Sequence, residues 1–209
     1  MIIPFVTSND EFEQCALPLT LAEAPWRAQY PYMPEVHLRI AHNNQELLLA
    51  WHVREDCIRA EATADGGPVW EDSCVEFFLQ PSSQSDRPSP YYNIECNCAG
   101  RLLVGYGKNR HNREMAPADI MAAISRHSSL GSGIRPLTDG DCAWELSMAI
   151  PIATFFHDDL SSLSGRHARA NFYKCGDRLT KPHFLTYFPI GLPRPDFHCP
   201  DFFGDIVFE

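Results

Sequence analysis

The sequence has 209 residues, and its 17 lysines and arginines against 27 aspartates and glutamates give a formal net charge of −10. A chain of this length usually forms one domain and can bury a substantial hydrophobic core. Hydrophobic residues at 44% and charged residues at 21% are ordinary globular values, which excludes an intrinsically disordered chain. Because an acidic surface repels phosphate backbones and anionic lipids, we expect neither nucleic acid nor membrane as a partner.

The N-terminal 34 residues contain five prolines that interrupt any regular period. We therefore expect an irregular extension packed on a single domain of residues 1–209, with a short helix at 9–15 that starts from an Asn or Asp cap. The first residues show no basic stretch before a long apolar run, so the sequence predicts neither a signal peptide nor a membrane span. On this ground alone the protein would be cytoplasmic.

After residue 34 the sequence pattern changes to short runs of alternating apolar and polar residues. These runs are rich in β-branched and aromatic side chains, which is typical of strands. The predicted strands are 36–41, 46–53, 57–64, 73–80, 91–98, 101–106, 134–136, 143–150, 168–174 and 205–208. Residues 81–90 and 107–118 read as loops, 120–127 as a strand or a short helix, and 151–156 as the start of a short helix. Many strands and few helices predict an all-β fold, an antiparallel β-sandwich with jelly-roll-like topology and immunoglobulin-like layers.

The eight cysteines favour reduced, structural thiols over a disulfide framework, because dense frameworks belong to short secreted domains. Several lie within apolar strands, and the strand period places Cys96 and Cys98 on the apolar face. Since the sequence contains no Cys-x-x-Cys pair, we do not expect a structural zinc site.

Two neighbouring predicted strands carry polar side chains at every second position. The period of two puts Glu76 on one face of the first strand, and Glu95 and Asn97 on one face of the second. Trp70 lies just before the first strand, at its rim. An indole beside carboxylate and amide groups suits a sugar, because the C–H face of a pyranose packs on the ring while its hydroxyls need polar partners.

Other interpretations of these residues stay open. A strand that faces solvent carries polar side chains without any ligand. Glu76 and Glu95 could instead serve a glycoside hydrolase, which needs two carboxyl groups roughly 5–10 Å apart. A third hypothesis is a sandwich domain that holds haem between methionine and histidine, with Met115, His52 and His127 as candidates.

Aromatic residues fixed by prolines are concentrated in the C-terminal third, and such loops are costly to expose unless they pack or bind. Phe184 and Tyr187 are candidates for an aromatic wall opposite Trp70. We expect Phe197 and Phe202 to cap the end of the sandwich, with Gly204 allowing the bend into the last strand.

Five segments in order, 69–79, 91–97, 144–151, 171–174 and 197–204, resemble the family 9 carbohydrate-binding modules, and more closely their stand-alone family 9-like relatives. The resemblance implies a β-sandwich that grips a sugar, often at a glycan chain end, between two aromatic side chains. Trp70 would be one wall, and Glu76, Glu95, Asn97 and Asn171 would contact the ligand. The family's second wall is usually a late tryptophan, and since none follows Trp144, Phe184 or Tyr187 would replace it.

The same resemblance implies a non-catalytic protein that supports glycan or polysaccharide catabolism alongside glycoside hydrolases, in the periplasm or outside the cell. It implies no required cofactor. Structural calcium is compatible with the family, although the sequence shows no twelve-residue calcium loop.

Overall fold

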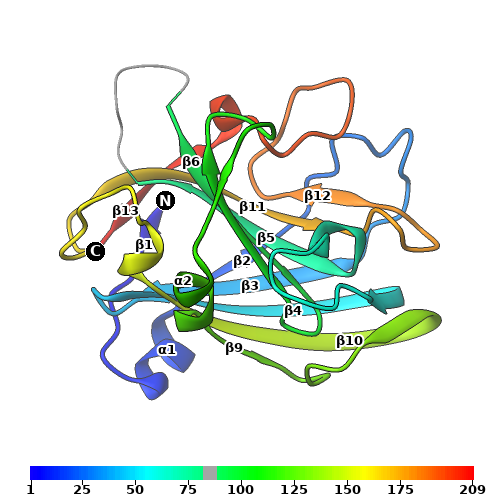
Figure 1. The fold of residues 1–209 in the computed structure, drawn as a ribbon, viewed down its shortest axis with the longest axis horizontal. Coiled ribbons are helices and arrows are strands. Elements are labelled where there is room, and N and C mark those ends of the chain that lie inside the picture. The colour runs from blue at the N-terminus through cyan, green and yellow to red at the C-terminus, as the bar shows by residue number, and fades with distance from the viewer. Residues whose placement is uncertain (82–88) are drawn as a thin grey trace.

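A computed structural model describes residues 1–81 and 89–209 and shows two β-sheets stacked as layers (Figure 1). The predicted all-β sandwich is confirmed. Most of the predicted loop at 81–90 falls outside the described residues. In the part of the chain that is described, no helix is long and apolar enough to cross a membrane.

The first layer, sheet A, surrounds the two polar strands singled out in the sequence. Its strand order is β1 (Ile2–Ile3), β13 (Gly204–Phe208), β11 (His167–Cys175), β5 (Cys74–Gln80), β6 (Tyr91–Asn97), β7 (Leu102–Gly107) and β8 (Glu114–Met115), and β12 (Phe184–Thr186) also pairs with β11. The pairing is antiparallel except between β1 and β13, which run parallel.

The second layer, sheet B, is antiparallel throughout its named strands. Its order is β2 (Leu17–Thr20), β3 (Glu35–His42), β4 (Glu46–Ala60), β10 (Arg135–Pro151) and β9 (Ser125–Ser128). The sequence predicted β4 as two strands and the start of β10 as a separate one. Each forms a continuous strand instead, and two register shifts in the β4–β10 pairing absorb the irregular stretch.

Helices are few and short, namely α1 (Asn9–Cys15), α2 (Ala118–Ala123) and the 3₁₀ turns η1 (Val69–Glu71), η2 (Ile152–Thr154) and η3 (Pro200–Phe202). The predicted helix at 9–15 is confirmed, but its cap differs. The hydroxyl of Ser8 accepts the backbone N–H of Glu11, so the serine and not Asn9 or Asp10 caps the helix.

The N-terminal 34 residues are not the irregular extension that the sequence predicted. They supply β1 to sheet A and β2 to sheet B, in addition to α1. Pro18 is accommodated because β2 is an edge strand, where a missing N–H removes no ladder bond on the open side.

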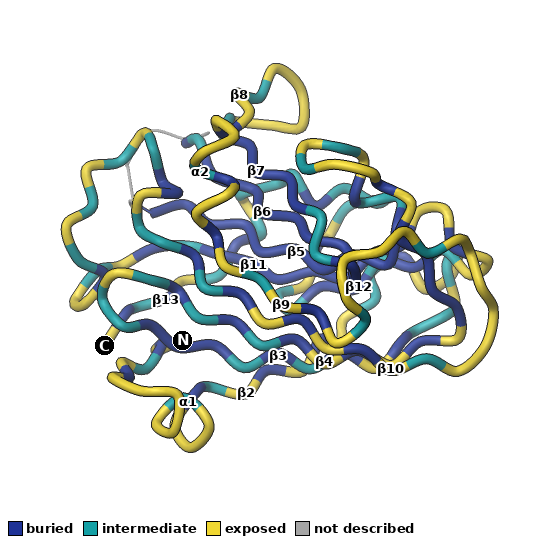
Figure 2. Tube along the Cα trace, turned by 60° about the horizontal axis from the view of Figure 1, so that its bottom comes forward, coloured by how far each residue is buried: buried dark blue, intermediate teal, exposed yellow. Residues whose placement is uncertain are grey.

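The main core lies between the two sheets. The inward faces of β5, β6 and β11 contribute Phe77, Ile94 and Phe172, and the Phe77 and Phe172 rings stack with centroids 5.2 Å apart. Cys96 and Cys98 belong to this core, as predicted, and all eight cysteines are unpaired. Figure 2 shows the buried strands of both layers with exposed residues gathered in the loops.

A second hydrophobic cluster covers the outer face of sheet A. The residues around Trp26 and those of the loops between β12 and β13 lie across this face, and the Phe197 ring stacks on Tyr173 at 4.2 Å. One interpretation of the sequence was that the polar face of these strands is open to solvent, whereas the structure shows that face covered. Phe197 does pack in a core, but over the face of the sheet and not at the end of the sandwich.

Candidate functional site

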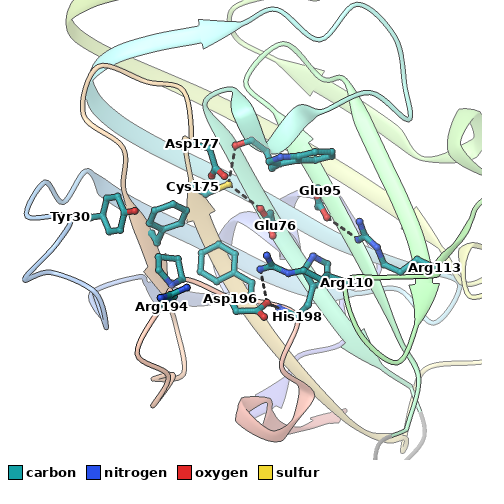
Figure 3. Close-up of a pocket in the computed structure, with 14 residues that line it drawn as sticks. Tyr30, Glu76, Glu95, Arg110, Arg113, Cys175, Asp177, Arg194, Asp196 and His198 are labelled. Carbon is teal, nitrogen blue, oxygen red and sulfur yellow. Dashed lines mark hydrogen bonds and ion pairs between the residues drawn. The ribbon is translucent and has the colours of Figure 1, made fainter.

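The covered outer face of sheet A keeps one opening, a pocket of about 540 Å³ in the described structure (Figure 3). Side chains from β5, β6, β11 and β12, from η1 and from four connecting loops surround it. The lining residues are Tyr30, Trp70, Glu76, Glu95, Arg110, Arg113, Cys175, Asp177, Phe184, Arg194, Pro195, Asp196, Phe197 and His198. The volume is in the range of about 300–1,000 Å³ that small-molecule sites usually have.

Trp70 is held at the pocket by the η1 turn. Val69 anchors this turn in the outer cluster, and the half-buried Trp70 follows it. The carbonyl of Trp70 accepts the backbone N–H of Asp177 at 3.2 Å and the Cys175 thiol at 3.5 Å, which ties the turn to the end of β11. The backbone that carries the indole is therefore fixed independently of a ligand.

Phe184 is the second predicted aromatic that reaches the pocket. It begins β12, and its ring contacts Tyr30 edge-on at 4.8 Å and lies 6.1 Å from Phe197. Tyr187, the other candidate, does not line the pocket. Its ring lies against Phe172, on the side of the main core.

Glu76 and Glu95 lie directly opposite each other on β5 and β6, and both are buried. Burial raises the pKa of Glu76 well above its ordinary value, and the neighbouring charge of Glu95 raises it further. Burial also raises the pKa of Glu95, to about 7, although the Arg113 guanidinium opposes the shift. At neutral pH the pair therefore holds at least part of a proton, so the two groups can donate as well as accept hydrogen bonds.

Glu95 is held in place by two side chains. The Asn93 amide donates to its Oε1 at 2.9 Å, and Arg113 donates to the same oxygen at 3.4 Å. The Asn93 side chain packs directly against Gly105 on the next strand. A Cβ at position 105 would lie 2.8 Å from the Asn93 amide oxygen, so a larger residue there would displace the amide. The glycine on β7 thus supports a carboxyl group on β6.

A group of possible metal ligands lies at the floor of the pocket. The donor atoms of Cys74, Glu76 and Cys175 lie within 4.8 Å of one another, and the Cys175 thiol donates to Glu76 Oε1 at 3.0 Å. Two thiols and one carboxyl group do not suit calcium, which takes six to eight oxygen ligands. Burial raises the pKa of Cys74 to about 12 and that of Cys175 as well, so both thiols stay protonated at neutral pH.

The remaining wall comes from the last loop and from the segment after β7. The His198 ring is hydrogen-bonded to the Tyr91 hydroxyl at 2.8 Å, and burial, with the charges of Arg113 and Arg110, lowers its pKa to about 2. His198 is therefore neutral and acts as an uncharged wall. Arg110 pairs with Asp196 at 2.8 Å across the pocket rim.

Besides Tyr187, two predicted binding residues do not line this pocket. Asn97 is buried at the end of β6, where its amide donates to Asp72 and its oxygen accepts the backbone N–H groups of Ala99 and Arg101. Asn171 instead fixes the C-terminal loop, because its amide donates to the Phe188 carbonyl and its oxygen accepts the Phe188 N–H. Both side chains are used within the protein, and neither lines the pocket, although both were expected to contact the ligand.

The sequence interpretation missed several pocket residues. Tyr30, Arg110, Arg113, Asp177 and Arg194 come from loops whose position no local pattern reveals. Phe197 and His198 lie within segment 197–204, which carries the family resemblance, although Phe197 was expected at the end of the sandwich and His198 was given no role.

The haem hypothesis gains no geometric support. Met115 lies on β8 at the edge of sheet A, whereas His52 and His127 lie on β4 and β9 of sheet B, and all three are exposed. His52 is occupied by a contact of 3.3 Å with Glu145.

The fold and the site define a non-catalytic carbohydrate-binding module, in which a β-sandwich presents an aromatic and carboxyl-lined pocket on one sheet. The chain belongs to carbohydrate-binding family 9, whose model matches residues 9–208. The family resemblance found in the sequence is thereby confirmed.

Solved structures agree with this assignment. The chain is similar to a Bacteroides uniformis protein classed provisionally as carbohydrate-binding, with 42% identity, a TM-score of 0.93, and coverage of 100% of this chain and 98% of that one. Two family 9 modules from Caldicellulosiruptor kristjanssonii, in complex with glucose and with cellotriose, are 12% identical. Their TM-scores are 0.62 and 0.59, with all of this chain and 95% and 93% of theirs covered, and they show the shared fold. No curated protein matches the chain.

Proposed function

We propose that this protein binds one terminal sugar of a glycan without cleaving it, in the pocket on the outer face of sheet A. The observation that carries the proposal is the meeting of two aromatic faces, Trp70 and Phe184, with the buried carboxyl groups of Glu76 and Glu95 in one pocket. Aromatic rings match the C–H face of a pyranose, and the carboxyl pair matches its hydroxyl groups.

The elevated pKa values of the pair fit this role. A hydroxyl group both donates and accepts, and a pair of carboxyl groups that shares a proton can satisfy both needs. The pocket is already bounded by ordered hydrogen bonds, from Asn93 to Glu95 and from Cys175 to Glu76, so little ordering is required on binding. Through such binding the protein would support glycan catabolism, as an accessory to glycoside hydrolases.

The test is calorimetry with glucose and cellotriose, the ligands of two solved family modules, followed by a panel of other mono- and oligosaccharides. Trp70→Ala should weaken the binding of the preferred sugar by at least about tenfold, which corresponds to about 1.4 kcal/mol. Phe5→Ala is the matched control, because Phe5 is an exposed aromatic residue outside the pocket. Absence of binding to every sugar, or equal binding by the Trp70→Ala variant, would overturn the proposal.

Hydrolysis is measured on the same samples. A binding module leaves aryl glycosides intact. Cleavage that disappears in both Glu76→Gln and Glu95→Gln would instead show a glycoside hydrolase that uses this pair.

A further inference from the structure

Three arginines line the pocket of a chain whose net charge is −10, together with the acidic residues Glu76, Glu95, Asp177 and Asp196. Arg110 and Arg113 come from the segment between β7 and β8, and Arg194 comes from the loop before η3. Figure 3 shows Arg110 and Arg113 on one side of the pocket, with Tyr30, Arg194 and Asp177 on the other. A neutral sugar does not require three arginines at its binding site.

Most hydrogen-bond donors of these three guanidinium groups have no partner among the described residues. Arg113 is 14% exposed and, within the described residues, makes one side-chain hydrogen bond, to Glu95 at the long distance of 3.4 Å. Arg110 is paired on one side, with Asp196. Arg194 is exposed, and among residues 1–81 and 89–209 its side chain has neither an ion pair nor a hydrogen bond. Because a guanidinium has five donors in a planar fork, most of the donors at this site are free for a ligand.

Four carboxyl groups line the pocket, but they repel an anionic ligand less than four full negative charges would. Glu76 and Glu95 are deeply buried and hold at least part of a proton at neutral pH. Asp196 is occupied by Arg110 and by the backbone N–H of His198. Asp177 is the acidic group that is exposed and has no ion pair among the described residues, and it lies on the far side from Arg110 and Arg113.

We propose that the pocket selects sugars that carry a negative charge, a uronic acid or a sulfate ester, with the free guanidinium of Arg194 as the principal partner of the anionic group. This inference rests on the proposed function, since it names the sugar class for the same pocket. Planar bidentate hydrogen bonds to carboxylate or sulfate are what distinguish arginine from lysine at such a site. Trp70, Phe184 and the carboxyl pair then contact the neutral part of the sugar.

The experiment uses sugars that differ only in charge. Calorimetry at neutral pH compares glucose with glucuronic acid and with glucose 6-sulfate, and galactose with galacturonic acid, each on the wild type, Arg194→Gln and Arg27→Gln. Arg27 is the matched control because it is an exposed arginine that does not line the pocket. The carboxylate and sulfate arms separate the two sources of negative charge.

We expect at least one charged sugar to bind at least tenfold more tightly than its neutral counterpart. Arg194→Gln should reduce that ratio at least fivefold, Arg27→Gln should leave it unchanged, and added salt should lower it in the wild type. Equal or weaker binding of the charged sugars, with neutral sugars still bound, would overturn this inference and leave the proposed function intact. A ratio that survives Arg194→Gln would also overturn it, whereas failure of every sugar to bind would overturn the proposed function itself.

Discussion

Glu95→Gln should change how the stability of the protein depends on pH. Glu95 is 2% exposed, and burial raises its pKa from 4.5 to about 7 in the folded state. The folded protein therefore favours the neutral carboxyl group. The contribution of Glu95 to stability is intact below about pH 4.5 and is lost as the pH rises through about 7, when the buried group must ionise.

The size of the effect follows from the shift. Each pKa unit corresponds to about 1.4 kcal/mol, so the full shift is worth about 3 kcal/mol, of which about 2 kcal/mol falls between about pH 5 and pH 8. The amide of a glutamine keeps the oxygen that accepts from Asn93 and Arg113, and it cannot ionise. We expect the wild type to lose about 2 kcal/mol more than Glu95→Gln over this range.

Urea unfolding of both proteins at each pH measures this difference. The buried histidines contribute equally to both proteins, whereas Glu76, whose pKa the charge of Glu95 raises, adds to the loss in the wild type. Glu145→Gln is the control, since that side chain is 69% exposed on sheet B, and its pH dependence should match the wild type. If the free energy of unfolding falls equally in the wild type and Glu95→Gln over this pH range, within about 0.5 kcal/mol, then the pKa of Glu95 is not raised by burial and the reasoning is refuted.

Two further predictions concern buried groups. Lys174 and Glu55 form an ion pair of 2.9 Å with neither side chain exposed, so Lys174→Met should cost about 3–5 kcal/mol in urea unfolding. Adding Glu55→Gln to that variant should recover part of the loss, and a double variant less stable than Lys174→Met would contradict the pairing. Thiol titration of the native protein near pH 8 should label the exposed Cys15 quickly and Cys74 only after unfolding, because the thiolate is the reactive form and the pKa of Cys74 is about 12. Labelling of both at equal rates would show that the outer face of sheet A is open.

Much of the fold is encoded in local patterns that the sequence displays directly. The alternation in β5 and β6 correctly predicted which faces carry Glu76 and Glu95, and these two lie together, opposite the inward-facing Phe77 and Ile94. The start of β10 was predicted wrongly, because its residues resemble a turn in the sequence. In the structure β-bulges at these positions let the hydrogen bonding to β4 continue. Strand β1 was missed because its partner β13 lies at the other end of the chain, and β2 was missed because Pro18 interrupts its pattern.

The pocket itself shows where local patterns stop. The sequence by itself placed Trp70, Glu76, Glu95 and Phe184 among the candidates, since a strand period and a turn position can be read without knowing the neighbours. Only the tertiary structure decided that a second layer of loop residues buries the carboxyl pair, and burial is what raises its pKa. The three arginines likewise reach the pocket on loops from distant segments, so the acidic net charge of the chain gave no sign of them.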